Sequence, residues 1–498
     1  MKRVLIERGR YFDSVFLLRA SRTLESLDGV RHAVVAMATP ANLESLARIG
    51  FEVPPGVRPD DLTVAIDADA ASLDAAEQRL ATFLAEGSEP VKSGRNQPAT
   101  LEDALSVDPE VRLALVSVPG VYAAAEARRA LRRGLHVLLF SDNVSIDDEI
   151  SLKDEAARRG LLLMGPDCGT AIVNGLPLGF ANVVRRGSIG IVGASGTGIQ
   201  EVSSLIDRLG GGVSQALGTG GRDLTKAVGA RSTLAALDAL AADRETAVLV
   251  VISKSPAPET EGRVLERLAQ SGKPAVVHFV GQGARSPDGQ VRFADTLAET
   301  ARAACRCIGI HAPDCPGGRP PQRALEAPDG RLCGLFCGGT LAQEAWVILR
   351  RSGVETHSNV AADQALRLRP DQTPPGHVVW DLGDDVFTVG RPHPMIEPAL
   401  RDERVAQAVN AERTSIVLVD CVLGYGAHAD PAASLARAAG SARRAVVIAS
   451  VTGTDRDPQR YREQRQRLEE VGILVAESNA EAAQWTAAAL RGRRERCR

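Results

Sequence analysis

Apolar residues along this chain come in short runs, and an alanine-rich stretch with helical spacing follows most of them. Residues 113–118 (LALVSV) form such a run, and residues 136–140 (HVLLF) and 161–164 (LLLM) repeat it after helical stretches. Regular alternation of strand and helix predicts βαβ units, which build parallel sheets. Loops at the carboxyl ends of such strands carry the ligand sites. We therefore predict an α/β protein with its functional residues in those loops.

The amino-terminal part has a different pattern. Strand-like runs precede helical stretches three times, at residues 4–7, 33–37 and 62–66. This order predicts a small ferredoxin-like α+β module over residues 1–95. Residues 86–100 are rich in Gly, Ser, Pro, Asn and Gln, as is typical of a linker. The βαβ alternation that follows predicts a Rossmann-like domain over residues 96–186.

The most informative feature is an internal duplication. Residues 189–201 (IGIVGASGTGIQE) resemble residues 333–344 (CGLFCGGTLAQE). Later segments match in the same order, at residues 218–223 and 382–385, 247–252 and 415–420, and 275–277 and 445–448. The offset suits a repeated domain rather than a solenoid repeat. We therefore predict two flavodoxin-like domains, over residues 187–312 and 330–495, joined by a linker rich in Pro and Gly.

Composition narrows the class of protein. A chain of 498 residues is too long for one hydrophobic core. A net charge of −3 supplies no basic field, so we expect no nucleic-acid partner. No apolar stretch has the length of a signal peptide or a membrane span, so we expect a cytoplasmic protein with no membrane partner. The eight cysteines lack the doublet spacing of zinc sites, which predicts reduced, buried thiols.

Each repeat contains a glycine-rich turn between a strand and a helix. The turns are formed by Ser195, Gly196 and Thr197 in the first repeat and by Gly338, Gly339 and Thr340 in the second. Backbone N–H groups and the positive end of a helix dipole converge at such a turn, which favours an anionic group. The Gly-Lys-Ser/Thr of a P-loop is absent. We predict two phosphate-binding turns, with tight helix–strand packing as the alternative role of the glycines.

A second candidate site follows the strand before residue 381. Asp384 and Asp385 precede Arg391, which could clamp a carboxylate or phosphate, and His393, which could act as an acid, a base or a neutral donor. The two aspartates could instead hold Mg²⁺. The alternative is a solvated loop whose aspartates cap a helix.

Histidines and a lysine elsewhere are weaker candidates. His428 opens a helix beside Asp430, and both substrate contact and simple capping fit that position. Lys254 ends a strand of the first repeat, where it could meet a substrate. His278 lies inside an apolar run, which favours a core histidine.

Five segments resemble the signature segments of the FdrA family, a branch of the succinyl-CoA synthetase superfamily. They are residues 140–144, 164–170, 193–201, 220–224 and 389–396. The resemblance extends over essentially the whole chain. It implies a CoA-binding-type domain, a ligase domain of the α-subunit type, and a domain like the carboxyl-terminal part of the β subunit. It also implies substrate binding by residues of these segments, namely Asp167, Cys168, Gly220 and Gly221, and a catalytic role for Arg222 or Arg391.

Three departures from the superfamily pattern change the implied chemistry. Residues 277–285 lack the Gly-His-Ala-Gly-Ala segment that carries the superfamily's phosphohistidine. The ATP-grasp module is missing, because the second ligase domain follows the first after a short linker. The Gly-Phe-Thr-Gly loop that receives CoA is not evident in the amino-terminal part. No cofactor is therefore expected with certainty. CoA and Mg²⁺ are both possible cofactors.

The FdrA resemblance implies a subunit of an oxamate carbamoyltransferase of anaerobic allantoin breakdown, acting with further protein subunits. That enzyme exchanges carbamoyl phosphate and oxamate with oxalurate and phosphate, and an acyl phosphate made elsewhere needs no ATP-grasp module. An acyl-CoA ligase with a separate ATP-grasp chain is the first alternative. A non-catalytic scaffold or regulatory subunit is the second.

Overall fold

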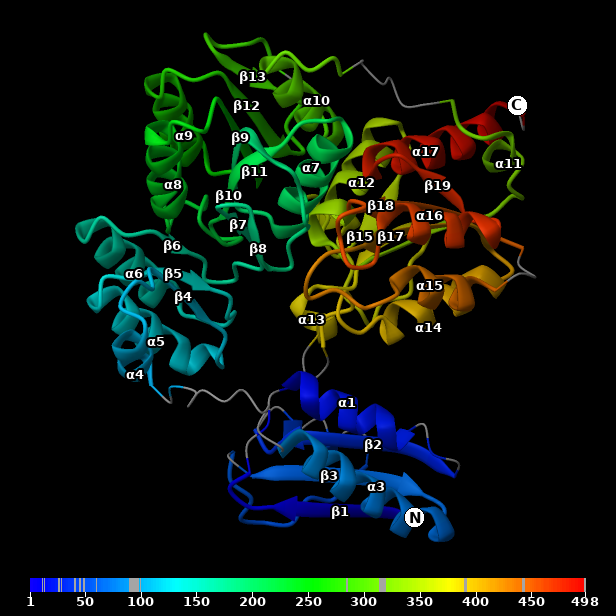
Figure 1. The fold of residues 1–498 in the computed structure, drawn as a ribbon. Coiled ribbons are helices and arrows are strands. Elements are labelled where there is room, and N and C mark those ends of the chain that lie inside the picture. Colours follow the sequence, from blue (N-terminus) through cyan, green and yellow to red (C-terminus); the bar gives the residue numbers. More distant parts are fainter. Residues whose placement is uncertain are drawn as a thin grey trace. The chain divides into compact units, whose positions relative to one another are not determined.

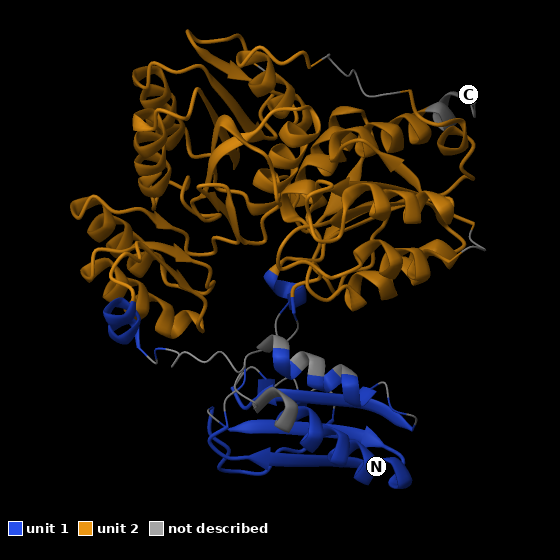
Figure 2. Cartoon of the chain, in the orientation of Figure 1, with its two compact units in different colours: residues 1–107, 385–392 blue, residues 108–384, 393–498 orange. Residues whose placement is uncertain are grey.

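The structure is a computed structural model in which the chain forms two compact units (Figures 1 and 2). Unit 1 comprises Met1–Val107 and Asp385–Pro392, and unit 2 comprises Asp108–Asp384 and His393–Arg498. The structure describes all residues except 11, 13, 26, 28, 40–41, 44–45, 48–49, 60, 89–97, 99, 284, 313–318, 389–391, 441–443 and 497–498. Parts of both predicted linkers, and Arg391, thus lie outside the described residues.

Unit 1 contains a three-stranded antiparallel sheet in the order β1-β3-β2. Its strands are β1 (Lys2–Glu7), β2 (Val30–Met37) and β3 (Leu62–Ala68), and its helices are α1 (Ser14–Glu25), α3 (Ala70–Ser88), α4 (Leu101–Val107) and α13 (Asp385–Thr388). Leu62, Val64 and Ile66 of the central strand are fully buried and pack in one cluster with residues of α1 and α3. The ferredoxin-like α+β module is confirmed.

Unit 2 begins with a small parallel sheet in the order β4-β5-β6. Its elements are β4 (Leu113–Val116), α5 (Gly120–Arg132), β5 (His136–Leu139), α6 (Ile146–Arg158) and β6 (Leu163–Met164). Ser145 caps α6 by accepting a hydrogen bond from the backbone N–H of Asp148 at 3.1 Å. This βαβαβ order is the Rossmann-like pattern that the sequence predicts.

The next sheet has seven strands in the order β13-β12-β11-β9-β10-β7-β8. The strands are β7 (Thr170–Val173), β8 (Leu176–Gly179), β9 (Arg186–Gly193), β10 (Val213–Gly218), β11 (Val248–Lys254), β12 (Ala275–Val280) and β13 (Val291–Phe293). The helices of this part are α7 (Gly196–Arg208), α8 (Arg231–Ala242), α9 (Pro258–Gln270) and α10 (Leu297–Cys307). The strands from β9 to β13 are parallel, and the antiparallel β7–β8 hairpin extends the sheet beside β10.

The last sheet has six parallel strands in the order β15-β16-β14-β17-β18-β19. The strands are β14 (Arg331–Phe336), β15 (Thr356–Ser358), β16 (His377–Asp381), β17 (Thr414–Val422), β18 (Val446–Thr452) and β19 (Leu474–Ala476). The helices are α11 (Gln322–Leu325), α12 (Gly339–Arg351), α14 (Ala399–Asn410), α15 (Pro431–Ala439), α16 (Tyr461–Glu470) and α17 (Asn479–Arg496), with a 3₁₀ turn η1 (Gln364–Leu366).

The two large sheets share one topology, which confirms the duplication. In both, the first strand (β9 or β14) lies between β10 or β16 on one side and β11 or β17 on the other, where two further parallel strands follow, as in a flavodoxin-like sheet; the second repeat has an additional edge strand, β15, beside β16. In the first repeat Gly193 pairs with Gly218 and with Ile252, whereas in the second Phe336 pairs with Asp381. Gly193 and Phe336 both end the first strand of their repeat, so Gly218 of the first repeat is equivalent to Asp381 of the second. In the second repeat Leu335 pairs with Val419, so the next residue, Asp420, lies opposite Phe336 and is equivalent to Ile252.

The two repeats share one apolar core. A single cluster of buried side chains includes Ile199 and Val202 of α7 together with Leu341 and Ala345 of α12. In Figure 1, α7 and α12 lie side by side between the two sheets. No helix among the described residues has both the length and the apolar character that a membrane crossing requires.

Candidate functional site

The first helices of the two repeats begin at the same point. Ser195 is the N-cap of α7, and its Oγ accepts a hydrogen bond from the backbone N–H of Gly198 at 3.0 Å. The same Oγ lies 2.6 Å from Oγ1 of Thr340, in the first turn of α12. Both hydroxyls are buried, with residue exposures of 8% and 5%. The positive ends of two helix dipoles therefore converge, and such a point favours an anion. We call this place the helix junction.

Glycine is required where the helices approach so closely. A Cβ on Gly338 would lie 2.9 Å from Cγ2 of Thr197, and a Cβ on Gly339 would lie 2.5 Å from Oδ2 of Asp381. Any larger residue would push the two helix starts, or the Asp381 carboxylate, out of place. The structure thus brings together all six residues of the two predicted phosphate-binding turns.

The two helix starts differ in how their backbone N–H groups are used. In the second repeat, the carboxylate of Asp420 accepts from the N–H groups of Cys337 and Gly338, at 2.7 Å each. In the first repeat, no described residue accepts a hydrogen bond from the N–H groups of Gly196 and Thr197. At the equivalent positions of α12, no described residue accepts a hydrogen bond from the N–H groups of Gly339 and Thr340 either, so both helix starts offer open donors to an anion.

Asp381 ends strand β16 beside the start of α12. Its Oδ1 accepts a hydrogen bond from the N–H of Gly383 at 2.9 Å. Burial raises the pKa of Asp381 to about 7, with Asp384 and Asp420 adding repulsion and Lys254 opposing the rise. Burial also raises the pKa of Asp420, although two N–H groups bind its carboxylate. The sequence places Asp381 at the start of the candidate acidic segment, but only Asp384 and Asp385 of that segment are predicted as site residues.

His393 lies next to the helix junction through Gly383. A Cβ on Gly383 would meet both Nε2 of His393, at 2.5 Å, and the carbonyl oxygen of Cys337, at 2.7 Å. Nδ1 of His393 accepts from the N–H of Met395 at 3.2 Å, so the proton of the neutral ring is on Nε2. Burial lowers the pKa of His393 to about 4. His393 is therefore neutral at physiological pH and suits a hydrogen-bond donor.

Of the remaining candidates of the second repeat, His428 and Asp384 belong to unit 2, like His393. The backbone N–H of His428 donates to the carbonyl of Met395 at 2.8 Å, and its Nδ1 accepts from the N–H of Asp430 at 3.1 Å. Oδ2 of Asp384 accepts from the side-chain amide of Asn359 at 3.3 Å. Asp385 begins α13 in unit 1. Within the described ranges, no group of three or more His, Cys, Asp and Glu side chains is arranged to hold a metal ion.

A second group of predicted residues lies in the loops after β6 and β10. Gly220 has φ +85° and packs against the carbonyl of Pro166, and a Cβ on Gly221 would lie 3.4 Å from Oδ2 of Asp167. Cys168 is buried against Gly218, and burial raises the pKa of its thiol to about 12. The thiol of Cys168 therefore occupies the space that a side chain at position 218, the end of β10, would need.

Arg222 belongs to a buried charge network that the sequence did not reveal. Its Nη2 lies 2.9 Å from Oε2 of Glu149 and 2.8 Å from the carbonyl of Val144. Lys153 is 2% exposed and donates to Glu149 and Asp223 at 2.7 Å each. Asp223 in turn accepts from the first N–H groups of α8. The network joins α6 to the first repeat, so the contacts of Arg222 favour a positioning role.

Two buried glutamates hold the repeats together in a reciprocal way. Glu201 of α7 accepts from the N–H of Asn479, which begins α17 of the second repeat, at 3.0 Å. Glu344 of α12 accepts from the N–H of Leu297, which begins α10 of the first repeat, at 2.7 Å, and from Nδ2 of Asn479 at 2.8 Å. Each repeat thus caps the last helix of the other, which fixes α7 and α12 at the junction.

Glu344→Gln is expected to change how stability depends on pH. Burial raises the pKa of Glu344 to about 7, so the folded state binds its proton more tightly than the unfolded state does. Stability is then lost as pH rises from about 4.5 through about 7, by about 3 kcal/mol. The variant should flatten this fall when thermal unfolding is measured from pH 5 to pH 8. Glu403→Gln, at an exposed position of α14, is the control and should keep the wild-type slope.

Three family models match parts of this chain. The model described as CoA-ligase matches residues 335–489, and the CoA binding domain model matches residues 184–281. The model described as AllF, heavy metal-associated domain, matches residues 1–100. The two starts of the helix junction thus fall one in each of the CoA-related matches.

Similarity to one curated protein over nearly the whole chain shows the family. The uncharacterized protein YahF of Escherichia coli K12 is 40% identical over 497 residues, which cover 96% of this chain and 96% of YahF. The chain belongs to the YahF family. This member of the YahF family combines matches to an AllF domain model, a CoA binding domain model and a CoA-ligase model.

More distant relatives match parts of this YahF-family chain. The α subunit of the ADP-forming succinate–CoA ligase of Methanothermobacter thermautotrophicus is 26% identical, over 36% of this chain and 60% of that subunit. Among solved structures, the apo form of the dinucleotide-forming acetyl-coenzyme A synthetase 1 of Ca. Korarchaeum cryptofilum is 16% identical. It covers 78% of this chain and 85% of its own, with a TM-score of 0.33.

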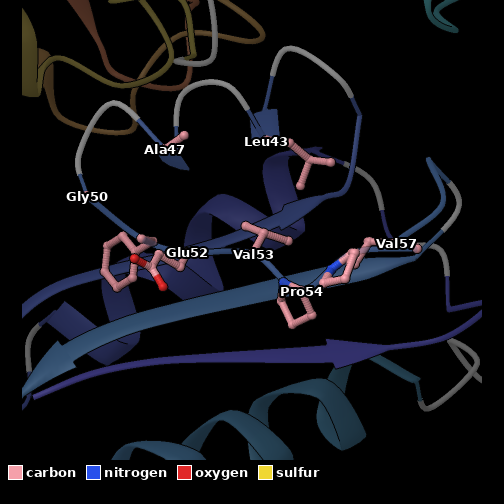
Figure 3. Close-up of a pocket in the computed structure, with 10 residues that line it drawn as sticks. Leu43, Ala47, Gly50, Glu52, Val53, Pro54 and Val57 are labelled. Carbon is pink, nitrogen blue, oxygen red and sulfur yellow. The ribbon is translucent and has the colours of Figure 1, made fainter.

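The AllF-type domain of this YahF-family member carries a groove (Figure 3). Leu43, Phe51, Val53, Pro54 and Val57 line it, and Glu52 is the one charged residue among the described residues of its lining. Residues 1–100 contain no cysteine. A paired-thiolate metal site is therefore excluded in this domain, despite the name of the matching family model.

Proposed function

We propose that this chain is an FdrA-type subunit of a carbamoyltransferase that exchanges oxamate and carbamoyl phosphate with oxalurate and phosphate. The observation that carries the proposal is the helix junction, where buried hydroxyls of Ser195 and Thr340 meet beside open N–H groups of α7. Such donors suit a phosphoryl group. The match to an AllF domain supports a role in allantoin breakdown.

The residues of the junction would act by positioning and charge stabilisation. The phosphoryl group of carbamoyl phosphate would accept hydrogen bonds from the N–H groups of Gly196 and Thr197. Lys254 is exposed, ends β11, and has no salt bridge to a described residue, so it can neutralise the charge of the leaving phosphate. His393 would donate a hydrogen bond from its Nε2–H group to the substrate. The carboxylate clamp assigned to Arg391 rests on the sequence alone.

An acyl-CoA ligase is the second candidate, and the matches to the CoA-ligase and CoA binding domain models favour it. The open donors of α7 fit a phosphate of CoA as well as that of carbamoyl phosphate. His278, at the place of the superfamily's phosphohistidine segment, is 1% exposed, and its Nδ1 lies 2.9 Å from the carbonyl oxygen of Ala294. Burial lowers the pKa of His278 to about 4. Its burial argues against a phosphohistidine step in this chain.

The test is turnover by the chain assembled with its co-purifying subunits. With carbamoyl phosphate and oxamate we expect release of phosphate together with one oxalurate per phosphate, and no dependence on ATP or CoA. Oxalurate and phosphate should run the reaction backwards. Formation of a CoA thioester from ATP, CoA and a carboxylate, with no oxalurate, would instead establish the ligase.

A non-catalytic subunit is separated from both enzymes by substitution at the junction. The pair Ser195→Ala and Thr340→Val removes both buried hydroxyls. A carbamoyltransferase whose site lies here should lose at least about tenfold in rate, since a lost donor to developing charge commonly costs more. An assembled complex with an unchanged rate would show that its site lies on another chain.

A further inference from the structure

The two repeats place different groups around their matching helix starts. In the second repeat, the strands on either side of β14 carry Asp381, at the end of β16, and Asp420, near the end of β17. The equivalent residues of the first repeat are Gly218 and Ile252. Beside Gly196, the first helical residue of α7, lies the hydroxyl of Thr170, whose Oγ1 would be 3.2 Å from an added Cβ. A neutral hydroxyl thus stands where the second repeat has carboxylates.

This asymmetry separates two chemical environments at one junction. On the α7 side the two strand positions beside β9 are the uncharged Gly218 and Ile252, and the cation Lys254 ends β11 two residues after Ile252. The α12 side has two carboxylates, which repel phosphate. An anion and a group that must lose a proton therefore suit opposite sides of the junction.

Asp381 is built to take a proton on the α12 side. Its backbone is fixed, since its N–H donates to Oδ1 of Asn359 and its carbonyl accepts from Nδ2 of Asn359, at 2.9 Å each. Gly383 binds its Oδ1, which leaves Oδ2 with no hydrogen bond from the described residues, directed at Gly339. The residue is 7% exposed. A buried carboxylate oxygen with no donor therefore faces the junction.

Three charged groups and one neutral ring lie around Asp381. Asp420 lies in the neighbouring strand β17, and Asp384 lies in the loop after β16. Lys254 comes from β11 of the first repeat, and the neutral ring of His393 lies against Gly383. Burial and the two carboxylates raise the pKa of Asp381, and Lys254 lowers it, which leaves a value of about 7. A base with this pKa is matched to proton transfer at neutral pH.

We infer that the two repeats divide the reaction, with the phosphoryl group bound at α7 and Asp381 at α12 accepting the proton of the attacking amide. The inference rests on the proposed function. The amide nitrogen of oxamate attacks the carbonyl carbon of carbamoyl phosphate, and the new C–N bond forms as the C–O bond to phosphate breaks. The electron pair of that bond leaves with the phosphate. The proton lost by the nitrogen passes to Oδ2 of Asp381, and phosphate or water takes it up afterwards.

The test compares Asp381→Asn with the wild-type assembled complex. The amide oxygen of the variant can still accept from Gly383, and Asn359 still holds the backbone, so the fold is retained. We expect the turnover rate to fall by about 10²- to 10⁴-fold, the usual worth of a general base. The wild-type rate should rise with pH through about 7, and this rise should disappear in the variant. Asp381→Glu should recover part of the rate.

Sulfate binding separates proton transfer from substrate binding. Sulfate keeps its charge between pH 6 and pH 8.5, so a change in its affinity reports on the protein. Because Asp381→Asn removes a nearby negative charge, sulfate should bind the variant at pH 8 at least as tightly as it binds the wild type. Asp371→Asn is the control, because it removes the same charge at an exposed position. It should alter neither the turnover rate nor the affinity for sulfate.

Each contrary outcome has a distinct meaning. A variant at Asp381 that keeps the wild-type rate and pH profile would overturn the inference and leave the proposed function intact. A variant that loses sulfate binding together with its rate would also overturn it, because the residue would then serve binding. A wild-type complex that makes no oxalurate would overturn the proposed function, and this inference with it.

Discussion

Thr340→Asp is expected to abolish phosphate binding while the protein stays folded. The new carboxylate would lie in the first turn of α12, where the helix dipole and the hydroxyl of Ser195 both favour a negative charge. It would also fill the junction with a charge of the same sign as the ligand. Two like charges about 4 Å apart repel by about 4 kcal/mol at an effective dielectric constant near 20. Calorimetry with inorganic phosphate should therefore show a loss of affinity of at least about 100-fold.

Two further substitutions at the same position control for this result. Thr340→Ser keeps the hydroxyl that lies 2.6 Å from Ser195 and should bind phosphate within about twofold of the wild type. Thr340→Val keeps the shape and loses the hydroxyl, and should fall between the two. If Thr340→Asp bound phosphate as tightly as Thr340→Ser, the junction would not be the phosphate site.

Lys153→Met is expected to destabilise unit 2 strongly. Lys153 is buried between Glu149 and Asp223, each 2.7 Å from its ammonium group. Removal leaves two buried carboxylates with fewer partners, which commonly costs about 3–5 kcal/mol. The loss should appear as a lower urea midpoint and as faster amide exchange in α6 and α8, which the network joins.

The control for this change is Lys226→Met. Lys226 pairs with Glu259 at 3.1 Å, but both side chains are mostly exposed, so solvent screens the pair. Its urea midpoint should match the wild type. Equal midpoints for the two methionine variants would show that the buried network contributes little to stability.

Much of the architecture could be predicted because it depends on local patterns. Alternation of strand and helix predicts the parallel sheets, and the resemblance of residues 189–201 to residues 333–344 predicts two domains of one topology. The close approach of the two helix starts is harder to predict from the sequence. It depends on Gly338 and Gly339, whose missing side chains let α7 and α12 come together, and on the reciprocal caps of Glu201 and Glu344.

The chemistry around the helix starts could not be predicted, because it is set by burial and by long-range contacts. Asp381 and Asp384 both belong to one acidic segment, yet the first faces the junction and the second faces Asn359. Arg222 has the sequence context of a catalytic cation, and its guanidinium instead meets Glu149, which is 73 residues earlier in the chain. Only the fold shows which side of the junction carries the carboxylates.

A crystal structure of the chain grown with inorganic phosphate tests the central claim most directly. We expect phosphate at the helix junction, accepting hydrogen bonds from the hydroxyls of Ser195 and Thr340 and from the N–H groups of Gly196 and Thr197. The hydroxyl pair, now 2.6 Å apart, should open to receive it. Phosphate bound instead at the Gly220–Gly221 loop, with the Ser195–Thr340 contact unchanged, would contradict the account.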